Sequence, residues 1–217
     1  MKVWVCVFIS LIVLIFSCEQ KHKRLTIGIQ PLGTTDTAEL TQVTTSIQAI
    51  FDAEVYILET VELPQSAFVN IKSHRYRGDS LLLFVMRNKP DSIDFIIGYT
   101  SQDISVTKRN IDGSIKVPES KYSDWGVFGL ANLSGTTSIV SSFRLKGNKA
   151  LFLERLSKIS IHELGHSFGL PHCINDSCIM QDAAESIHTI DRVELYFCSK
   201  CHQRIFGKIG SDFSSNK

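Results

Sequence analysis

The segment at residues 162–173 reads HELGHSFGLPHC, and it holds three of the seven histidines of the chain. It overlaps the end of Lys149–Phe168, in which apolar residues recur near helical spacing and no proline interrupts them. This pattern predicts one long helix that ends at Gly169, because glycine adopts backbone conformations that residues with a Cβ atom resist. The fold must therefore accommodate a helix and a turn that bring these histidines together.

The three histidines have the spacing of metal ligands. His162 and His166 are four residues apart, so their imidazole rings project from nearly the same face of a helix. After the turn at Gly169, the chain can return His172 to the same place as a third ligand. Zinc accepts histidine nitrogen at ~2.0–2.1 Å, and a fourth position left open for water is typical of a catalytic zinc.

Glu163 lies next to the first of these histidines, where a carboxylate can reach a zinc-bound water without binding the metal itself. A bare HExxH motif often arises by chance, but the extended HExxHxxGxxH fixes five positions and is much harder to meet by accident. The segment therefore predicts a metal site. The remaining histidines match no ligand position and are not candidates for catalysis: His22, His74, His188 and His202.

Four cysteines follow with a second metal-binding pattern. Cys198 and Cys201 form a CxxC clip, and Cys173 and Cys178 supply a second pair from another segment. Together they can form a closed four-thiolate structural zinc site that pins a C-terminal helix beside the loop carrying His172. In an oxidising compartment the same cysteines could instead form two disulfides, and their three possible connectivities remain open.

The combined pattern resembles the archaemetzincins, a family within the metzincin metalloproteases. The motif HExxHxxGxxHC is followed by Cys178, Met180 and the pair in CSKC, at the spacings of that family. A weaker resemblance extends upstream through FIIGYT and GVFGLANL, so that it covers roughly residues 25–206. The resemblance implies two zinc ions per chain, a catalytic one and a structural one. Their ligands would be His162, His166 and His172 for the first, and Cys173, Cys178, Cys198 and Cys201 for the second.

The same resemblance implies hydrolysis of peptide bonds in a peptide or protein substrate. Glu163 would be the general base and later the proton donor to the leaving amine, and Met180 would form an apolar floor under the histidines. The substrate would lie extended beside Gly126–Asn132, the expected edge strand of the sheet. One alternative is a non-catalytic zinc-binding lipoprotein, although such a protein has no need of Glu163. Another is an aminopeptidase in place of an endopeptidase.

Alternating strand and helix patterns predict an α+β fold, and the resemblance implies a compact metzincin-like domain. Its sheet should be mixed, mostly parallel and twisted, with a long active-site helix and a C-terminal helix pinned by the four cysteines. The predicted strands are Leu25–Gln30, Glu54–Glu59, Ile93–Thr100, Gly126–Asn132 and Ser138–Phe143. The predicted helices are Thr37–Phe51, Leu81–Arg87 capped by Asp79 or Ser80, Lys149–Phe168, and Asp191–Phe206 capped by Asp191. Residues 101–124 have the composition of a surface loop.

The N-terminal residues have the pattern of a secretion signal. The apolar run Val3–Phe16 is too short to span a bilayer comfortably, and Cys18 follows it as in the lipobox of bacterial lipoproteins. We expect a signal peptide at 1–17, a linker at 18–24, one metallopeptidase domain at 25–210 and a flexible tail at 211–217. The bulky Phe16 and the basic cluster Lys21–Arg24 favour the alternative of an uncleaved membrane anchor.

Composition is consistent with this organisation. A length of 217 residues, 43% of them hydrophobic, is enough for one domain with a sizeable core. The formal charge of +1 argues against nucleic acid as a partner. From the N-terminal pattern, we expect a monomer in the cell envelope. It would be bound to the membrane through a lipid on Cys18 and would face the periplasm or the exterior.

Overall fold

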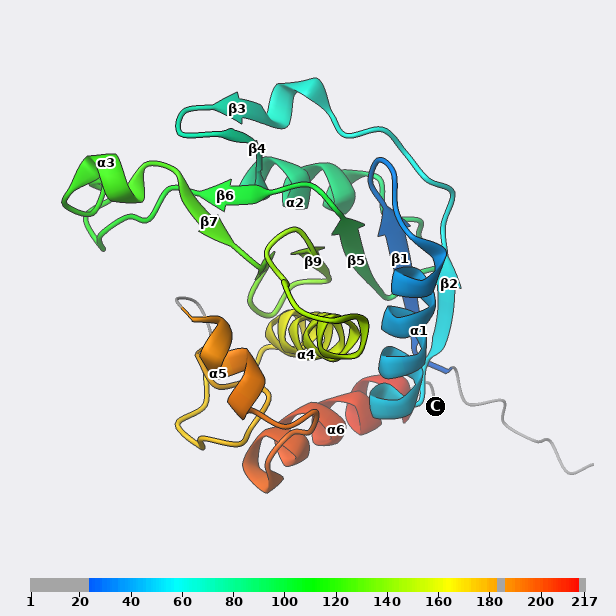
Figure 1. The fold of residues 1–217 in the computed structure, drawn as a ribbon. Helices are drawn as coiled ribbons and strands as arrows, with labels where there is room; N and C mark the ends of the chain where they lie inside the picture. Colours follow the sequence, from blue (N-terminus) through cyan, green and yellow to red (C-terminus); the bar gives the residue numbers. More distant parts are fainter. Residues whose placement is uncertain (1–23, 183–185, 215–217) are drawn as a thin grey trace, which may run out of the picture.

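The computed structural model describes residues 24–182 and 186–214 (Figure 1). The expected signal peptide and residues 18–23 of the expected linker lie outside this part of the chain. In the described part, no helix combines the length and the apolar character that crossing a membrane requires.

The centre of the molecule is a five-stranded sheet in the order β2-β1-β5-β9-β8. Three neighbouring pairs in it are parallel, and β8 pairs antiparallel with β9 to form its edge. This arrangement confirms the predicted mixed, mostly parallel sheet. The strands are β1 (Thr26–Pro31), β2 (Glu54–Ile57), β5 (Phe95–Thr100), β8 (Gly129–Ala131) and β9 (Thr137–Ser141).

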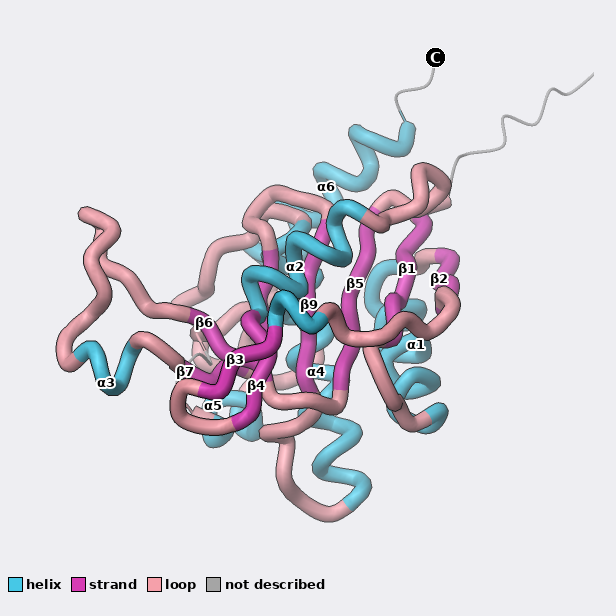
Figure 2. Tube along the Cα trace, turned by 90° about the horizontal axis from the view of Figure 1, so that it is seen from above, coloured by secondary structure: helices cyan, strands magenta, loops and turns pink. Residues whose placement is uncertain are grey.

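Helices cover both faces of this sheet. Helix α1 (Thr37–Phe51) and helix α4 (Lys149–Ser167) pack together on one face, and α2 (Gly78–Arg87) lies on the other (Figure 2). Successive side chains of a strand point to opposite faces, so the buried strands feed two cores. Thus Ile97 packs in the core around α1 and α4, whereas its neighbour Ile96 packs in the core under α2.

A second sheet of four short strands was not predicted. Its order is β3-β4-β6-β7, with bounds β3 (Phe68–Asn70), β4 (His74–Arg77), β6 (Ile104–Val106) and β7 (Trp125–Val127). A 3₁₀ helix, η1 (Gln65–Ala67), precedes β3, and the short helix α3 (Glu119–Tyr122) precedes β7. The prediction of residues 101–124 as a surface loop was therefore wrong for β6 and α3.

Polar composition concealed this sheet because its charged residues are paired inside the molecule. Asp103 is buried, and its carboxylate accepts hydrogen bonds from Arg75 at 2.8 Å and from Arg144 at 2.7 Å. The prediction of Gly126–Asn132 as one strand was also wrong, since the chain changes sheets at Phe128.

The C-terminal region differs from the prediction of one helix over Asp191–Phe206. It forms two helices, α5 (Ile187–Arg192) and α6 (Ser199–Ser214), and α6 continues through part of the expected tail. Asp191 is not a helix cap, because its carboxylate accepts hydrogen bonds from Arg155 on α4. The chain between the two helices buries Val193 and Phe197 in the core, which requires a break in the helix.

Helix α2 likewise begins earlier than predicted. It follows β4 directly and starts at Gly78, so Asp79 lies in its first turn and neither Asp79 nor Ser80 is the cap.

Candidate active site

Helix α4 carries the histidine motif into the interior of the protein. The side chain of Asn148 caps the helix by accepting a hydrogen bond from the backbone N–H of Leu151 at 3.0 Å. The helix ends at Ser167 with Phe168 as its cap, and the next residue is Gly169, whose φ of 94° is costly for any residue with a Cβ atom. The backbone N–H of Gly169 donates to the carbonyl of His166 at 2.8 Å. This turn sends the chain back toward the helix, as predicted.

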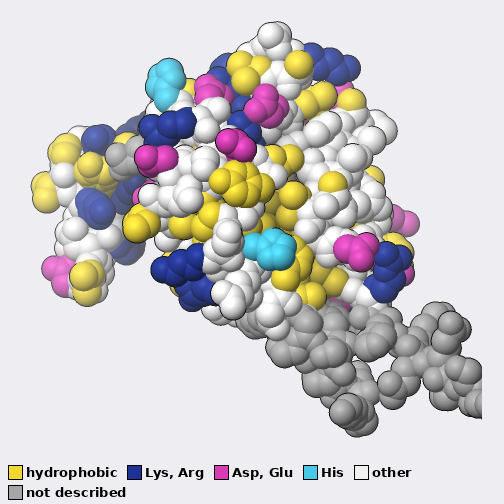
Figure 3. Space-filling model, turned by 90° about the horizontal axis from the view of Figure 1, so that it is seen from below, with side chains coloured by type: hydrophobic (Ala, Val, Ile, Leu, Met, Phe, Trp, Pro, Cys, Tyr) yellow, Lys and Arg dark blue, Asp and Glu magenta, His cyan; other side chains and the backbone are white. Residues whose placement is uncertain are grey.

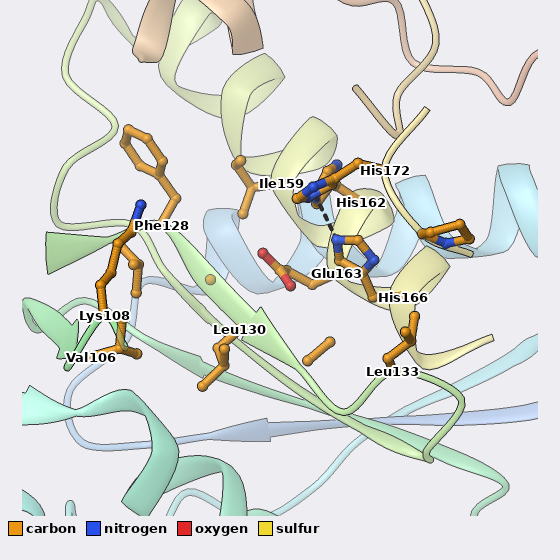
Figure 4. A pocket seen from close by; sticks show the side chains of 14 residues that line it. Val106, Lys108, Phe128, Leu130, Leu133, Ile159, His162, Glu163, His166 and His172 are labelled. Carbon is orange, nitrogen blue, oxygen red and sulfur yellow. Dashed lines mark hydrogen bonds between the residues drawn. The ribbon is translucent and has the colours of Figure 1, made fainter. Parts of the chain in front are cut away.

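The structure brings His162, His166 and His172 together. One ring nitrogen from each lies within 4.8 Å of the other two, and Figure 4 shows the three rings gathered near Glu163. His162 is buried, whereas the side chain of His172 is 43% exposed. The site is therefore open to solvent on the side of His172. Three other histidines of the described chain lie outside this group: His74, His188 and His202.

Backbone carbonyls fix the tautomers of the two helical histidines. Nδ1 of His162 lies 2.7 Å from the carbonyl of Ile179, and Nδ1 of His166 lies 2.7 Å from the carbonyl of Leu170. Each Nδ1 must carry the proton to donate to a carbonyl, which leaves a lone pair on each Nε2.

The two Nε2 atoms face each other at 3.1 Å. Two lone pairs at this distance repel each other, and a cation between them removes the repulsion. Two nitrogens bound to one tetrahedral zinc at ~2.05 Å would lie ~3.3 Å apart, which agrees with the observed separation. Burial, and to a smaller extent the nearby His166, lowers the pKa of His162 to about 3. Both observations indicate neutral imidazoles arranged to hold a metal ion.

Asp182 adds an outer contact that the sequence pattern did not predict. Its carboxylate lies 3.5 Å from Nδ1 of His172. A carboxylate beside one ring nitrogen favours a proton there and makes the other nitrogen a better metal ligand. Each of the three histidines thus has an oxygen atom near its Nδ1.

Glu163 lies in a confined position between α4 and the edge strand β8. It is only 7% exposed, and burial raises the pKa of its carboxyl group to about 8. A Cβ atom on Gly129 of β8 would lie 2.6 Å from Oε1 of Glu163, so only glycine leaves room for this carboxylate. The motif located Glu163, but the contact with Gly129 could not be inferred from spacing.

Met180 packs directly against the histidine-bearing helix. It is fully buried, and a Cβ atom on Gly165 would lie 2.4 Å from its sulfur atom. Gly165 stands in the middle of the motif, between His162 and His166, and it allows Met180 to approach the helix there. Glycine destabilises the interior of a helix relative to alanine. A glycine at such a position therefore indicates that another side chain packs closely against the helix backbone there.

The four predicted cysteines also converge. Their sulfur atoms all lie within 4.8 Å of one another, and the cysteines are free thiols in this structure. The sulfurs of Cys173 and Cys198 are 3.8 Å apart. Two sulfurs bound to one tetrahedral zinc at ~2.3 Å would be ~3.8 Å apart, whereas a disulfide bond is ~2.05 Å long. The residues therefore fit a four-thiolate zinc site better than a disulfide pair.

The cysteine loop reaches the histidine site through one carbonyl. Ile179 follows Cys178, and its carbonyl is the group that accepts the hydrogen bond from His162. The backbone N–H of Cys173 donates to the carbonyl of Met180 at 2.8 Å, which closes the same loop. Anything that holds this loop in place therefore also orients a histidine of the other site.

A pocket of about 470 Å³ lies in front of the histidines. Figure 3 shows hydrophobic side chains gathered around a histidine on the face seen from below. Strand β8 forms one wall of the pocket. Lys108, which the sequence analysis did not single out, also lines it. The lining residues are Val106, Lys108, Val127, Phe128, Gly129, Leu130, Ala131, Leu133, Ile159, His162, Glu163, His166, Pro171 and His172.

Comparison with known proteins places this site in a family. Residues 31–206 match the model of peptidase family M54. The chain is 30% identical over 181 residues to an archaemetzincin of Archaeoglobus fulgidus. The alignment covers 82% of this chain and 98% of the relative. It is 26% identical over 190 residues to an archaemetzincin of Haloquadratum walsbyi, with 83% of this chain and 99% of the relative covered.

Solved structures agree with the sequence comparison. A crystal structure of the Archaeoglobus fulgidus archaemetzincin, complexed with malonate, superposes with a TM-score of 0.67 over 83% of this chain and 100% of that chain. The archaemetzincin of Methanopyrus kandleri shares the fold at 24% identity, with a TM-score of 0.71 over 86% of this chain and 96% of that chain. The chain belongs to peptidase family M54, the archaemetzincins, and is a zinc-dependent metallopeptidase.

Proposed function

We propose that His162, His166 and His172 hold the catalytic zinc and that Glu163 is the general base of peptide-bond hydrolysis. The observation that carries this proposal is the pair of opposed Nε2 lone pairs, 3.1 Å apart, next to a buried carboxylate. A zinc ion bound there would polarise the scissile carbonyl and lower the pKa of a bound water toward ~7.

Glu163 is placed to move the proton. Its carboxylate lines the same pocket as the three histidines, with β8 on its other side. It would accept a proton from the attacking water and return it to the nitrogen of the leaving amine. In the metal-free protein, burial favours its protonated form. A cation at the histidines would favour the ionised form, because opposite charges attract strongly in a poorly solvated site.

Strand β8 is suited to hold the substrate main chain. It is the edge of the sheet and pairs only with β9 among the described strands. The backbone of Asn132 donates to the carbonyl of Thr137, and that of Ser141 donates to the carbonyl of Phe128. In an antiparallel pair, successive residues alternate between hydrogen bonding to the partner strand and pointing away from it. The N–H and C=O groups of Gly129 and Ala131 therefore point to the open edge. An extended peptide can pair with them there.

The second part of the proposal is a structural zinc on the four cysteines, giving two zinc ions per chain. The backbone N–H of Cys201 lowers the pKa of the Cys198 thiol to about 7, which favours the thiolate that zinc requires. Elemental analysis should then give two zinc ions per chain for the wild type and one for Cys178→Ser. One zinc or none in the zinc-supplemented wild type would contradict the two-site proposal.

A cleavage experiment tests the role of Glu163. The purified, zinc-loaded protein is incubated with a diverse peptide mixture, and the products are identified by mass spectrometry. Cleavage should disappear in Glu163→Gln and persist in Glu119→Gln, a matched control on the exposed surface of α3. The new termini distinguish endopeptidase from aminopeptidase action. If the folded, zinc-loaded protein cleaves nothing, the non-catalytic alternative is favoured.

We also propose that the protein is a monomeric lipoprotein of the cell envelope, anchored through Cys18. The supporting observation is the short apolar run that ends just before this cysteine. Cys18→Ala should abolish the mass increase that lipidation causes and should move the protein out of the membrane fraction. Unchanged mass and fractionation would favour the uncleaved anchor, and light scattering of the purified protein would test the monomer.

A further inference from the structure

The four cysteines of the C-terminal region differ in their access to solvent. Cys173 and Cys198 are partly exposed, whereas Cys178 and Cys201 are buried in the core, at 0% and 5% exposure. The cluster therefore has an outer pair of sulfur atoms, those of Cys173 and Cys198, and an inner pair. Oxidants react with cysteines that are accessible, so the outer pair has the access that oxidation requires.

The two sulfur atoms of the outer pair are already in contact. They lie 3.8 Å apart and belong to residues separated by 25 positions in the sequence. Cys173 follows the last histidine of the motif, and Cys198 directly precedes helix α6. A disulfide bond is ~2.05 Å long, so the two sulfurs must approach by about 1.8 Å, from 3.8 Å, to form one. Such a bond would link the histidine loop to the start of α6.

We propose that Cys173 and Cys198 form a reversible disulfide when the protein meets a hydroperoxide such as hydrogen peroxide, and that this bond removes zinc from the cysteine site. The inference rests on the proposed function, because it concerns the same four thiols. Zinc binds cysteine as the thiolate, which is also the form that attacks a peroxide. The oxidised protein would keep only the inner pair of thiolates, and two ligands do not complete a tetrahedral structural site.

The reaction balances with one molecule of hydrogen peroxide. One outer sulfur attacks a peroxide oxygen, the O–O bond breaks, and a sulfenic acid forms as hydroxide leaves. The other outer sulfur attacks the sulfur of the sulfenic acid, the S–O bond breaks, and a second hydroxide leaves. The two sulfurs together lose two electrons, which reduce the peroxide, and two protons from solvent convert the hydroxides to water.

The new bond would also reach the histidine site. Cys173 follows His172 directly, and its backbone N–H donates to the carbonyl of Met180 at 2.8 Å. The side chain of His172 is 43% exposed, so little packing holds it in place. Metal–ligand distances vary by only about 0.2 Å, and a fraction of the sulfur movement is enough to misplace His172. Oxidation should therefore weaken zinc binding at the histidines about 10–100-fold in chelator competition, and an unchanged affinity would contradict this coupling.

Peroxide treatment of the purified, zinc-loaded wild type tests the inference. Elemental analysis after desalting measures the zinc that remains, and peptide mapping by mass spectrometry identifies the disulfide. We expect the loss of one zinc ion per chain together with a Cys173–Cys198 link, both reversed by dithiothreitol and added zinc. Retention of all zinc, the absence of a disulfide, or a link between Cys198 and Cys201 instead would overturn the inference.

Two histidine substitutions separate the outer pair from the inner pair. Cys173→His and Cys201→His each leave three cysteines and one histidine, a ligand set that also holds structural zinc. Cys201→His keeps both outer thiols and should still lose zinc in peroxide, whereas Cys173→His should retain it. Equal loss of zinc from both variants would overturn the inference. If either variant fails to fold, the peptide map of the oxidised wild type still decides.

The zinc content of the untreated protein keeps this result separate from the proposed function. Fewer than two zinc ions per chain before treatment would contradict the two-site proposal, and the zinc release with it. Two zinc ions per chain that both survive peroxide would overturn this inference alone. Neither measurement requires the protein to cleave a peptide.

Discussion

The contact between Gly129 and Glu163 leads to a quantitative prediction for Gly129→Ala. The added Cβ atom would lie 2.6 Å from both Cγ and Oε1 of Glu163, whereas ordinary contacts begin at 3.4 Å. The carboxylate or strand β8 must therefore move by about 0.8 Å, the difference between these distances. Misplacing a reacting group by about 1 Å can cost ~100-fold in rate, so we expect kcat/KM to fall by roughly that factor.

The assay compares peptide cleavage, zinc content and thermal unfolding for Gly129→Ala and a control. Gly207→Ala is a suitable control, because a Cβ atom there meets nothing within 4 Å. The control should keep wild-type activity, and both variants should keep wild-type zinc content, since neither touches a metal ligand. Activity of folded, zinc-loaded Gly129→Ala within about threefold of the wild type would refute the proposed role of this contact.

Three further predictions concern the metal sites and the C-terminal region. Cys178→Ser should weaken zinc binding at the histidines about 10–100-fold in chelator competition, because the carbonyl of Ile179 orients His162; unchanged affinity would contradict this coupling. Asp191→Asn should lower the free energy of unfolding at neutral pH by about 1–2 kcal/mol, because Asp191 accepts charged hydrogen bonds from Arg155. These bonds lower the folded-state pKa of Asp191. The stability they add is therefore present above the unfolded pKa of ~3.9 and is lost as pH falls through the folded pKa. Urea titrations that gave the same difference in free energy of unfolding between wild type and Asp191→Asn at pH 7 and at about pH 2 would contradict this account. A chelator that strips only the histidine site should abolish cleavage without loss of far-UV circular dichroism, whereas stripping the cysteine site as well should lower the melting temperature.

Local sequence patterns predicted the central sheet and the active-site helix, because the hydrophobic pattern of each of these segments depends only on residues within the segment. Strands such as Phe95–Thr100 are buried on both faces and are mostly apolar, and Lys149–Ser167 keeps helical spacing without a proline. The histidine motif lies within two turns of one helix and the turn after it, so its geometry follows from helix pitch alone. The four cysteines were predicted from spacing, and the structure brings them together.

The remaining features depend on contacts between distant parts of the chain. The strands of the second sheet are short, and Arg75 of β4 is paired in a buried network around Asp103, so these segments lack the alternation that marks a strand. Nothing near Gly129 in the sequence shows that a carboxylate from α4 will occupy the space of its missing Cβ atom. Lys108 and Asp182 join the site only because the chain folds back on itself.

The most direct test of the histidine site is anomalous X-ray diffraction at the zinc absorption edge, from crystals of the purified, zinc-supplemented protein. We expect one peak ~2.0–2.1 Å from a ring nitrogen of each of His162, His166 and His172, and a second peak ~2.3 Å from the four cysteine sulfurs. A zinc peak among the cysteines with none among the histidines would contradict the central claim that these three side chains form the catalytic metal site.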